Sequence, residues 1–275
     1  MSPKIIYLNG KCVRASNRLI ASLAPGTIKG KGVFETMRAY KGKVFAFEAH
    51  MARMQKGLKT IGVNQRIASQ RILENIFQLL TKNRLKNARI RVAAWKDKNF
   101  QTAIVCQAYQ GPSHSKCTRG FQAIISSMKR NRSRYSSIKS LDYRDFQKAY
   151  AQARDQGCDE AILLNEQKNI VEGSRTNIFL VKKEKLFTPS LASGCLDGIT
   201  RNRVIQCARA QGFSVAIKKI KLNDLWKAEE VFLTNSLLEV MPLTVVNHRP
   251  IGSGKMGPVT KRLGQLYRQH VCHVL

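Results

Sequence analysis

The order of the predicted strands and helices changes along this chain of 275 residues, and that change limits the folds available to it. Asn9-Gly10, a pair that tolerates positive φ at both positions, separates two short strands and predicts a tight hairpin. A second strand pair is expected over 33–40 and 44–47. Beyond residue 137, single strands alternate with helices. Hairpins followed by alternation predict a smaller α+β lobe and then a larger α/β lobe.

Apolar residues at helical spacing predict the positions of the main helices, which are 48–61, 67–80, 143–156, 200–211 and 259–271. Further strands are expected over 90–95, 103–109, 161–164, 177–181, 213–217 and 231–233. A loop at 111–115 and a polar, basic stretch at 129–137 interrupt this pattern. The predicted organisation is a smaller N-terminal domain over 1–115, an interdomain linker over 116–137 and a larger C-terminal domain over 138–275.

The chain is strongly basic, with 48 Lys and Arg against 17 Asp and Glu, a formal net charge of +31 and a pI near 10.4. Such a charge suggests a nucleic-acid or other anionic partner. The basic residues nevertheless occur in short separate clusters, and the chain has no ribonucleoprotein motif, zinc-finger spacing or basic zipper. We interpret most of the charge as solvated surface that also attracts anionic substrates, so a small-molecule substrate is favoured over nucleic acid.

The seven cysteines are odd in number and include no Cys-x-x-Cys pair, which argues against a disulfide framework and against a metal site. No apolar run approaches the ~20 residues that a membrane-spanning helix requires. We therefore expect a cytoplasmic protein with no membrane partner and no bound metal.

Lys139 is the first candidate catalytic residue. Lysines are abundant in this chain, and most are surface charges. Lys139, however, lies between Ile138 and Leu141 at the start of a predicted helix. Apolar neighbours would partly desolvate its amine and favour the uncharged form, which can attack an aldehyde and form an imine.

Glu172 is the second candidate, because it lies between a strand and Gly173, where the backbone can pass close to a ligand. A buried carboxylate there could keep the nitrogen of a pyridine ring protonated. A simple turn carboxylate is the alternative.

Three further features could bind a phosphate. Gly198-Ile199-Thr200 opens a helix whose free amides attract anions, although Thr200 could be no more than a cap. Thr234 and Ser236 follow an apolar strand, as ligand-binding hydroxyls or as a polar turn. Arg53 lies beside the apolar face of the helix 48–61, where it could clamp a phosphate or lie on the surface.

Six ordered blocks of the sequence resemble the class IV, fold type IV pyridoxal-phosphate enzymes. They are Val33–Arg38, His50–Met54, Ile138–Leu141, Glu172–Phe179, Leu196–Arg201 and Leu233–Ser236. The resemblance spans nearly the whole chain. It implies the two-domain fold of the D-amino acid aminotransferase type, pyridoxal 5'-phosphate as cofactor and a homodimer.

The resemblance also implies roles for individual residues. Lys139 would form the Schiff base with the cofactor, and Glu172 would face the pyridine nitrogen. Tyr143 matches a position that approaches the oxygen of the cofactor ring. The phosphate would be held by Arg53, the amides of Ile199 and Thr200, and Thr234 or Ser236.

The family includes branched-chain aminotransferases, D-amino acid aminotransferases and 4-amino-4-deoxychorismate lyases, so membership alone does not fix the reaction. Branched-chain enzymes usually carry Phe-Glu-Gly and, after the lysine, Gly-Asn-Tyr. This chain has Thr36 in place of that glycine, and Ser140-Leu141-Asp142-Tyr143 after Lys139. Thr36 resembles a lyase feature, and the chain length and the Gly194–Arg201 turn point the same way.

The chain also departs from the family pattern. Lys31 stands in a Gly-Lys-Gly where members often have Gly-Asp-Gly, and Asp142 replaces a common asparagine. The first change could alter the mouth of the site or the dimer contacts, so it bears on substrate preference more than on cofactor binding.

The leading hypothesis from the sequence is a lyase of folate biosynthesis that releases 4-aminobenzoate and pyruvate from 4-amino-4-deoxychorismate, with Lys139 and Thr36 as catalytic residues. The first alternative is a class IV aminotransferase for D-amino acids or branched-chain L-amino acids. A more remote alternative, motivated by the charge, is a basic nucleic-acid-binding protein on an inactive enzyme fold.

Overall fold

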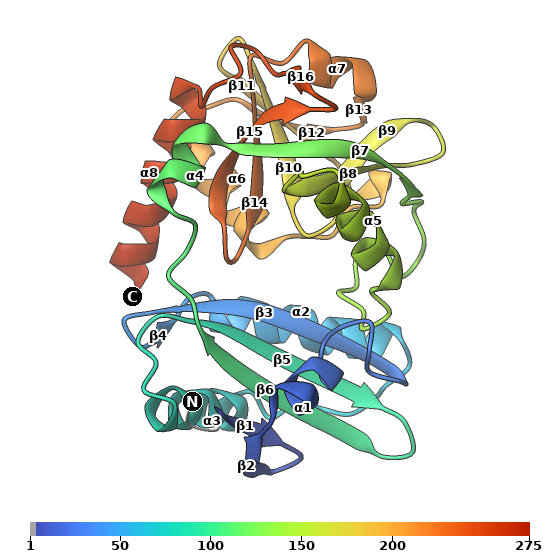
Figure 1. Ribbon diagram of the computed structural model, residues 1–275, viewed down its shortest axis with the longest axis vertical. Helices are drawn as coiled ribbons and strands as arrows, with labels where there is room; N and C mark the ends of the chain where they lie inside the picture. Colours follow the sequence, from blue (N-terminus) through green and yellow to red (C-terminus); the bar gives the residue numbers. More distant parts are fainter. Residues whose placement is uncertain (1–3) are drawn as a thin grey trace. The chain divides into compact units, whose positions relative to one another are not determined.

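The computed structural model describes residues 4–275, which form two compact units (Figure 1). The first unit contains the chain up to Gln110, the segment Ile138–Arg144 and Leu275. The second unit contains Gly111–Ser137 and Asp145–Val274.

The first unit is built on a six-stranded antiparallel sheet with the order β2-β1-β6-β5-β3-β4. Its strands are β1 (Lys4–Leu8), β2 (Lys11–Ala15), β3 (Lys31–Tyr40), β4 (Lys43–Val44), β5 (Ala88–Lys96) and β6 (Phe100–Ala108). Its helices are α1 (Asn17–Ser22), α2 (Phe47–Thr60) and α3 (Ser69–Lys82).

Strand β3 contributes buried side chains to both faces of the sheet, and Val33 and Phe34 are buried on opposite sides of it. Val33 and Met37 belong to a core cluster with Met54 of α2 and Ile76 of α3. Phe34 points the other way, into a second cluster that includes residues of α1. Side chains along a strand alternate between faces, so β3 supplies both layers of this unit.

The second unit contains a ten-stranded mixed sheet with the order β12-β11-β10-β14-β15-β7-β8-β9-β13, to which β16 adds beside β15 (Figure 1). Its strands are β7 (Phe121–Lys129), β8 (Glu160–Leu164), β9 (Asn169–Gly173), β10 (Asn177–Lys182), β11 (Lys185–Pro189), β12 (Val215–Lys218), β13 (Ile220–Lys221), β14 (Glu230–Asn235), β15 (Glu239–Val246) and β16 (Arg249–Pro250). Its helices are α4 (His114–Arg119), α5 (Arg144–Asp155), η1 (Leu191–Ser193), α6 (Ile199–Ala210), α7 (Leu222–Trp226) and α8 (Pro258–Val274).

The two units do not follow the boundaries predicted from the sequence. The expected linker 116–137 contains β7, which pairs in parallel with both β15 and β8 inside the second sheet. The segment Ile138–Arg144, expected at the start of the larger domain, belongs to the first unit. Its backbone explains this, because Leu141 N donates to Gly32 O at 3.0 Å and Phe34 N donates to Lys139 O at 2.9 Å.

One predicted strand is wrong. The stretch 44–47 is not extended, since β4 ends at Val44 and Ala46 adopts a left-handed conformation (φ 55°) as the N-cap of α2. The chain therefore turns directly from a short hairpin into the helix.

No helix within residues 4–275 is both long and apolar enough to cross a membrane.

A buried polar network joins α2 to β3 in the first unit. The Glu35 carboxylate is fully buried and accepts hydrogen bonds from Arg53 Nε at 2.7 Å and Arg53 Nη2 at 2.6 Å. His50 Nδ1 lies 2.8 Å from Glu35 Oε2. Burial by itself would raise the pKa of Glu35, but Arg53 and His50 together lower it from 4.5 to about 2. Burial also lowers the pKa of His50 below 6.5, so a neutral His50 donates to a charged Glu35.

We predict that Glu35→Gln destabilises the protein by about 3 kcal/mol, because it leaves Arg53 without its buried counter-charge. Urea denaturation at neutral pH measures this loss. Glu74→Gln is the control, since Glu74 is an exposed acid of the same unit on α3, and it should change the free energy of unfolding by less than ~0.5 kcal/mol. Equal effects of the two variants would contradict the prediction.

The pH dependence of the Glu35 effect follows from its lowered pKa. The stability that Glu35 contributes is fully present above its unfolded-state pKa of 4.5, and it is lost as the pH falls toward about 2. The difference in unfolding free energy between wild type and Glu35→Gln should therefore be constant from pH 5 to pH 7 and shrink below about pH 4.5.

Candidate active site

Lys139 is held against β3 by its backbone. The bridge between Val33 and Ser140 and the bond from Phe34 N to Lys139 O fix the segment at the sheet. Lys139 Nζ lies 4.7 Å from the centroid of the Phe34 ring and 5.8 Å from that of Tyr143. The two rings pack edge to face with centroids 5.3 Å apart. The amine therefore lies beside two aromatic rings on the Phe34 face of the sheet.

Thr36 lies on the same sheet face as Phe34, because residues two apart along a strand point the same way. Directly opposite Thr36 on β5 is Arg91, and opposite Arg38 is Arg89. These three arginines and Thr36 form one polar surface, which we call the arginine face.

The arginine face concentrates positive charge in a half-buried position. The guanidinium of Arg38 lies 4.4 Å from the centroid of the Tyr40 ring, and that of Arg89 donates to Gln107 Oε1. Arg91 Nη2 donates to Ile20 O at 3.3 Å, whereas its buried Nε has no hydrogen-bond partner among the described residues. Burial and the neighbouring Arg89 lower the pKa of Arg91 from 12.5 to about 10, so it remains a cation at neutral pH.

Arg53 lies on α2, and the Glu35 network fixes its orientation. Its side chain is largely buried, at 14% exposed. Burial is the main cause of the lowered pKa of His50, and the charges of Arg53 and Lys139 act in the same direction. The first unit thus places Lys139, Tyr143 and Thr36 on the Phe34 side of its sheet, whereas Arg53 is bound to Glu35, whose side chain points to the opposite side.

Glu172 lies at the end of β9 in the second unit and is buried. Its Oε2 accepts from Leu196 N at 2.9 Å, and its Oε1 lies 3.4 Å from Arg130 Nε. Arg130 also donates to Ser136 O at 3.0 Å, and its guanidinium lies 4.9 Å from the centroid of the Phe146 ring. Arg130 and the Leu196 amide favour the charged form of Glu172.

Ile199 and Thr200 are the first two residues of α6, whose N-cap is Gly198. No side chain within residues 4–275 caps this helix, so the amides of its first turn are available to an anion. A Cβ on Gly198 would lie 1.9 Å from Asn177 Oδ1, and Asn177 Nδ2 donates to Leu196 O at 2.9 Å. Asn177 thereby supports the loop that leads into the helix.

Thr234 lies at the end of β14, paired with Asn177 of β10. Its hydroxyl is buried and has no hydrogen-bond partner among residues 4–275. Ser236 lies half-buried in the following turn, which Asn235 braces by accepting from Leu237 N at 2.9 Å and Leu238 N at 2.7 Å. The second unit thus gathers Glu172, the start of α6 and the Thr234 hydroxyl around Asn177.

Sequence reasoning overlooked Arg130 and the arginine face. Arg130 is separated from Glu172 by 42 positions and lies in a stretch that reads as a solvated basic loop. The arginine face did leave a signal, because Arg38, Arg89 and Arg91 alternate with the buried residues of two strands, which puts polar groups on one face.

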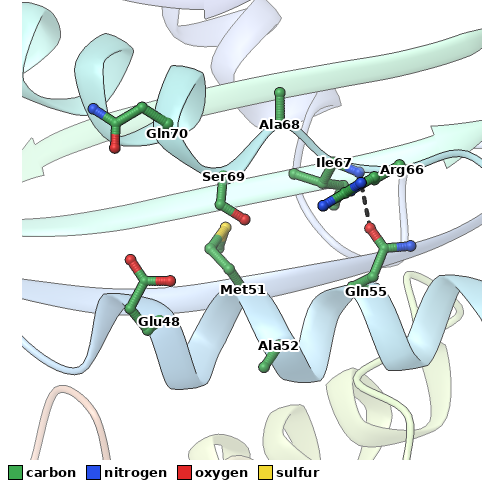
Figure 2. A pocket seen from close by; sticks show the side chains of 9 residues that line it. All are labelled: Glu48, Met51, Ala52, Gln55, Arg66, Ile67, Ala68, Ser69 and Gln70. Carbon is green, nitrogen blue, oxygen red and sulfur yellow. Dashed lines mark hydrogen bonds between the residues drawn. The ribbon is translucent and has the colours of Figure 1, made fainter.

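A separate hollow of ≈ 670 Å³ lies between α2 and the segment that leads into α3 (Figure 2). In it Gln55 Oε1 accepts from Ile67 N at 2.8 Å, and Glu48 and Arg66 lie at its rim. None of the predicted site residues lines this hollow. Within residues 4–275 no group of His, Cys, Asp and Glu side chains is arranged to bind a metal ion.

Comparison with known proteins identifies close structural relatives. The branched-chain amino acid aminotransferase of Escherichia coli superposes with a TM-score of 0.88 at 26% identity, covering 98% of this chain and 95% of that one. The corresponding T.th. enzyme, solved with pyridoxamine 5'-phosphate, has the same TM-score at 27% identity and the same coverage. The expected mixed α/β architecture of fold type IV is therefore confirmed.

Sequence relatives cover nearly the full chain. A putative branched-chain-amino-acid aminotransferase of Methanocaldococcus jannaschii is 32% identical, over 96% of this chain and 95% of its own length. The aminodeoxychorismate lyase of Bacillus subtilis is 30% identical, over 98% and 96%. The model of the amino-transferase class IV family matches residues 32–246. This protein belongs to the class IV aminotransferase family.

Proposed function

We propose that this protein is a pyridoxal-phosphate-dependent lyase that releases 4-aminobenzoate and pyruvate from 4-amino-4-deoxychorismate. The observation that carries the proposal is the arginine face, on which Thr36 lies opposite Arg91 and shares the Phe34 side of the sheet with the Lys139 amine. A homodimer and a cytoplasmic location, both expected from the sequence, are part of the same proposal.

The described residues fit pyridoxal phosphate. The uncapped start of α6, the unpartnered Thr234 hydroxyl and Arg53 are groups that suit a phosphate. Ser236, in the turn beside Thr234, is a further hydroxyl for it. Glu172 would pair with the pyridine nitrogen, Tyr143 with the ring oxygen, and Lys139 would hold the cofactor covalently.

When bound, the cofactor supplies an aldehyde that condenses with an amine and a ring that accepts the electron pair of a breaking bond. Lys139 Nζ, which is released when the substrate amine takes its place on the cofactor, would then take the proton from the amine-bearing carbon of the substrate. Glu172, kept charged by Arg130 and the Leu196 amide, holds a proton at the ring nitrogen. Thr36 donates a hydrogen bond to the departing enolpyruvate, which takes up a proton and becomes pyruvate.

The arginine face suits this substrate because 4-amino-4-deoxychorismate carries two carboxylates. Guanidinium groups bind carboxylates through paired, charge-assisted hydrogen bonds. The buried Nε of Arg91, which has no hydrogen-bond partner among the described residues, offers such a donor next to Thr36, and the adjacent Arg89 adds positive charge. An amino acid with an apolar branched side chain has only one carboxylate and would leave this charge unmatched.

A class IV aminotransferase is the second candidate, and two observations favour it. Several of the sequence relatives are named branched-chain-amino-acid aminotransferases. Lys139 is also suited to transfer a proton between the substrate carbon and the cofactor carbon, which is the additional step of transamination.

We predict that Lys139→Ala lowers the rate of 4-aminobenzoate formation by on the order of a thousandfold, because the variant has no amine to act as base or to hold the cofactor. Fluorescence of the released 4-aminobenzoate measures the rate. Lys82→Ala, which removes an exposed lysine at the end of α3, is the matched control and should retain full activity. Circular dichroism confirms the fold of both variants, and a folded, active Lys139→Ala would end the proposal.

Arg91→Met should raise KM for 4-amino-4-deoxychorismate by roughly 10-fold to 100-fold, as expected for a charge-assisted bond to a carboxylate. Its affinity for pyridoxal phosphate should not change, because Arg91 is not among the phosphate-binding groups. Arg71→Met, an exposed arginine on α3, is the control. An unchanged KM in Arg91→Met would remove the support that the arginine face gives to the lyase.

Visible absorption of the purified protein separates the two candidate reactions. D-alanine, L-glutamate and L-leucine are added in turn without a keto acid. We expect the band of the bound cofactor to persist with all three, because a lyase does not take the amino group from these donors. Loss of the band with one donor would identify an aminotransferase and name its donor.

A further inference from the structure

We propose that Glu160 is a positioning residue whose buried carboxylate sets the Gly173–Thr176 turn and, through it, both Glu172 and the loop at the start of α6. Its effect on the cofactor rests on the proposed function, whereas its effect on the turn does not.

Glu160 is the first residue of β8 and is 2% exposed. Its Oε1 accepts from Ala161 N at 2.9 Å, Ser174 N at 3.1 Å and the Ser174 hydroxyl. Its Oε2 accepts from Arg175 N at 3.3 Å and from Thr176 Oγ1 at 2.9 Å. No Lys or Arg side chain among the described residues forms a salt bridge with it. A buried carboxylate surrounded only by neutral donors depends on all of these hydrogen bonds.

The donors to Glu160 come almost entirely from one turn. Ser174, Arg175 and Thr176 connect β9, which ends at Gly173, to β10, which begins at Asn177. The turn is closed by Gly173 N, which donates to Thr176 O at 2.7 Å. A Cβ on Gly173 would lie 2.1 Å from Thr176 Oγ1 and 3.1 Å from the Glu160 carboxyl carbon. The Thr176 hydroxyl therefore fills the space that the missing side chain leaves, and the Glu160 side chain packs beside it.

The residues that flank this turn belong to the candidate site in the second unit, one on each side of the turn. Glu172 immediately precedes Gly173, and Asn177 immediately follows Thr176. Asn177 Nδ2 donates to Leu196 O, and Leu196 N donates to Glu172 Oε2. A displacement of the turn would thus move Glu172 directly and move the loop before α6 through Asn177.

Glu160→Gln tests the proposal, because it keeps the shape of the side chain while replacing one acceptor oxygen with an NH₂ group. Backbone amides cannot reverse their direction, so the NH₂ would face the Arg175 amide as donor against donor. The matched control is Glu230→Gln. Glu230 is a buried acid of the same unit that accepts from Val259 N at 3.0 Å and Thr260 N at 2.7 Å at the start of α8.

The first measurement is amide hydrogen exchange of the cofactor-free protein, which decides the positioning claim without any ligand. In Glu160→Gln we expect lost protection at 172–177 and at 196–200, with α8 unchanged. Glu230→Gln should lose protection at the start of α8 only. Unchanged exchange at 172–177 and 196–200 in Glu160→Gln would overturn the proposal.

The second measurement is the Kd for pyridoxal phosphate, titrated by absorbance and compared with the thermal midpoint of the cofactor-free protein. We expect the Kd to rise about tenfold in Glu160→Gln and to stay unchanged in Glu230→Gln. The thermal midpoints of the two cofactor-free variants should fall by similar amounts. Equal values of Kd for the two variants would overturn the proposed link to the cofactor. Wild type that binds no pyridoxal phosphate would instead refute the proposed function, and the exchange data would still decide the role of Glu160.

If Glu160→Gln does not fold, Thr176→Val and Thr176→Ser take its place. Valine removes one donor to Glu160 and should reproduce the exchange at 172–177 in milder form. Serine keeps the hydroxyl and should restore protection. Identical exchange in the two Thr176 variants would contradict the proposal.

Discussion

The backbone pairing between β3 and the segment Ile138–Arg144 is the interaction on which the arrangement in the first unit depends. Two hydrogen bonds and one bridge attach this segment to a strand that contributes to both core clusters of the unit. Lys139 therefore projects from a segment that is hydrogen-bonded to a sheet, where a surface loop would leave it mobile. Because Thr36 and the arginines lie on the strands of that sheet, their positions relative to the lysine are set by pleat and register.

Three buried carboxylates have different roles because their hydrogen-bond partners differ. Glu35 is charged, accepts two hydrogen bonds from Arg53 and so fixes the orientation of the Arg53 side chain. Glu172 has both a cation, Arg130, and a backbone amide as partners, which suits a group that must remain charged beside a ligand. Among the described residues Glu160 meets only neutral donors, and so it acts on the backbone around it. The identity of the donors, more than the depth of burial, separates these roles.

The sequence predicted the elements with a local signal. The helices expected at 48–61 and 200–211 lie at Phe47–Thr60 and Ile199–Ala210, because their apolar periodicity and flanking glycines are local features. Strand β7 was overlooked since its burial comes from parallel partners far along the chain. The same limit applies to the site. The motif that contains Glu172 is contiguous in sequence, but its partner Arg130 is brought to it only by the fold.

Residues 138–144 belong to the first unit although residues 111–137, which precede them, belong to the second, and this order has a consequence for biosynthesis. When residue 110 has emerged from the ribosome, all six strands of the first sheet have been synthesised. Ile138 and Leu141, which are buried in the two cores of that unit, have not yet emerged. Strand β7 of the second unit must be synthesised before those residues emerge. The nascent first unit therefore lacks two buried apolar side chains until Ile138 and Leu141 emerge, and both arrive together with the amine of Lys139.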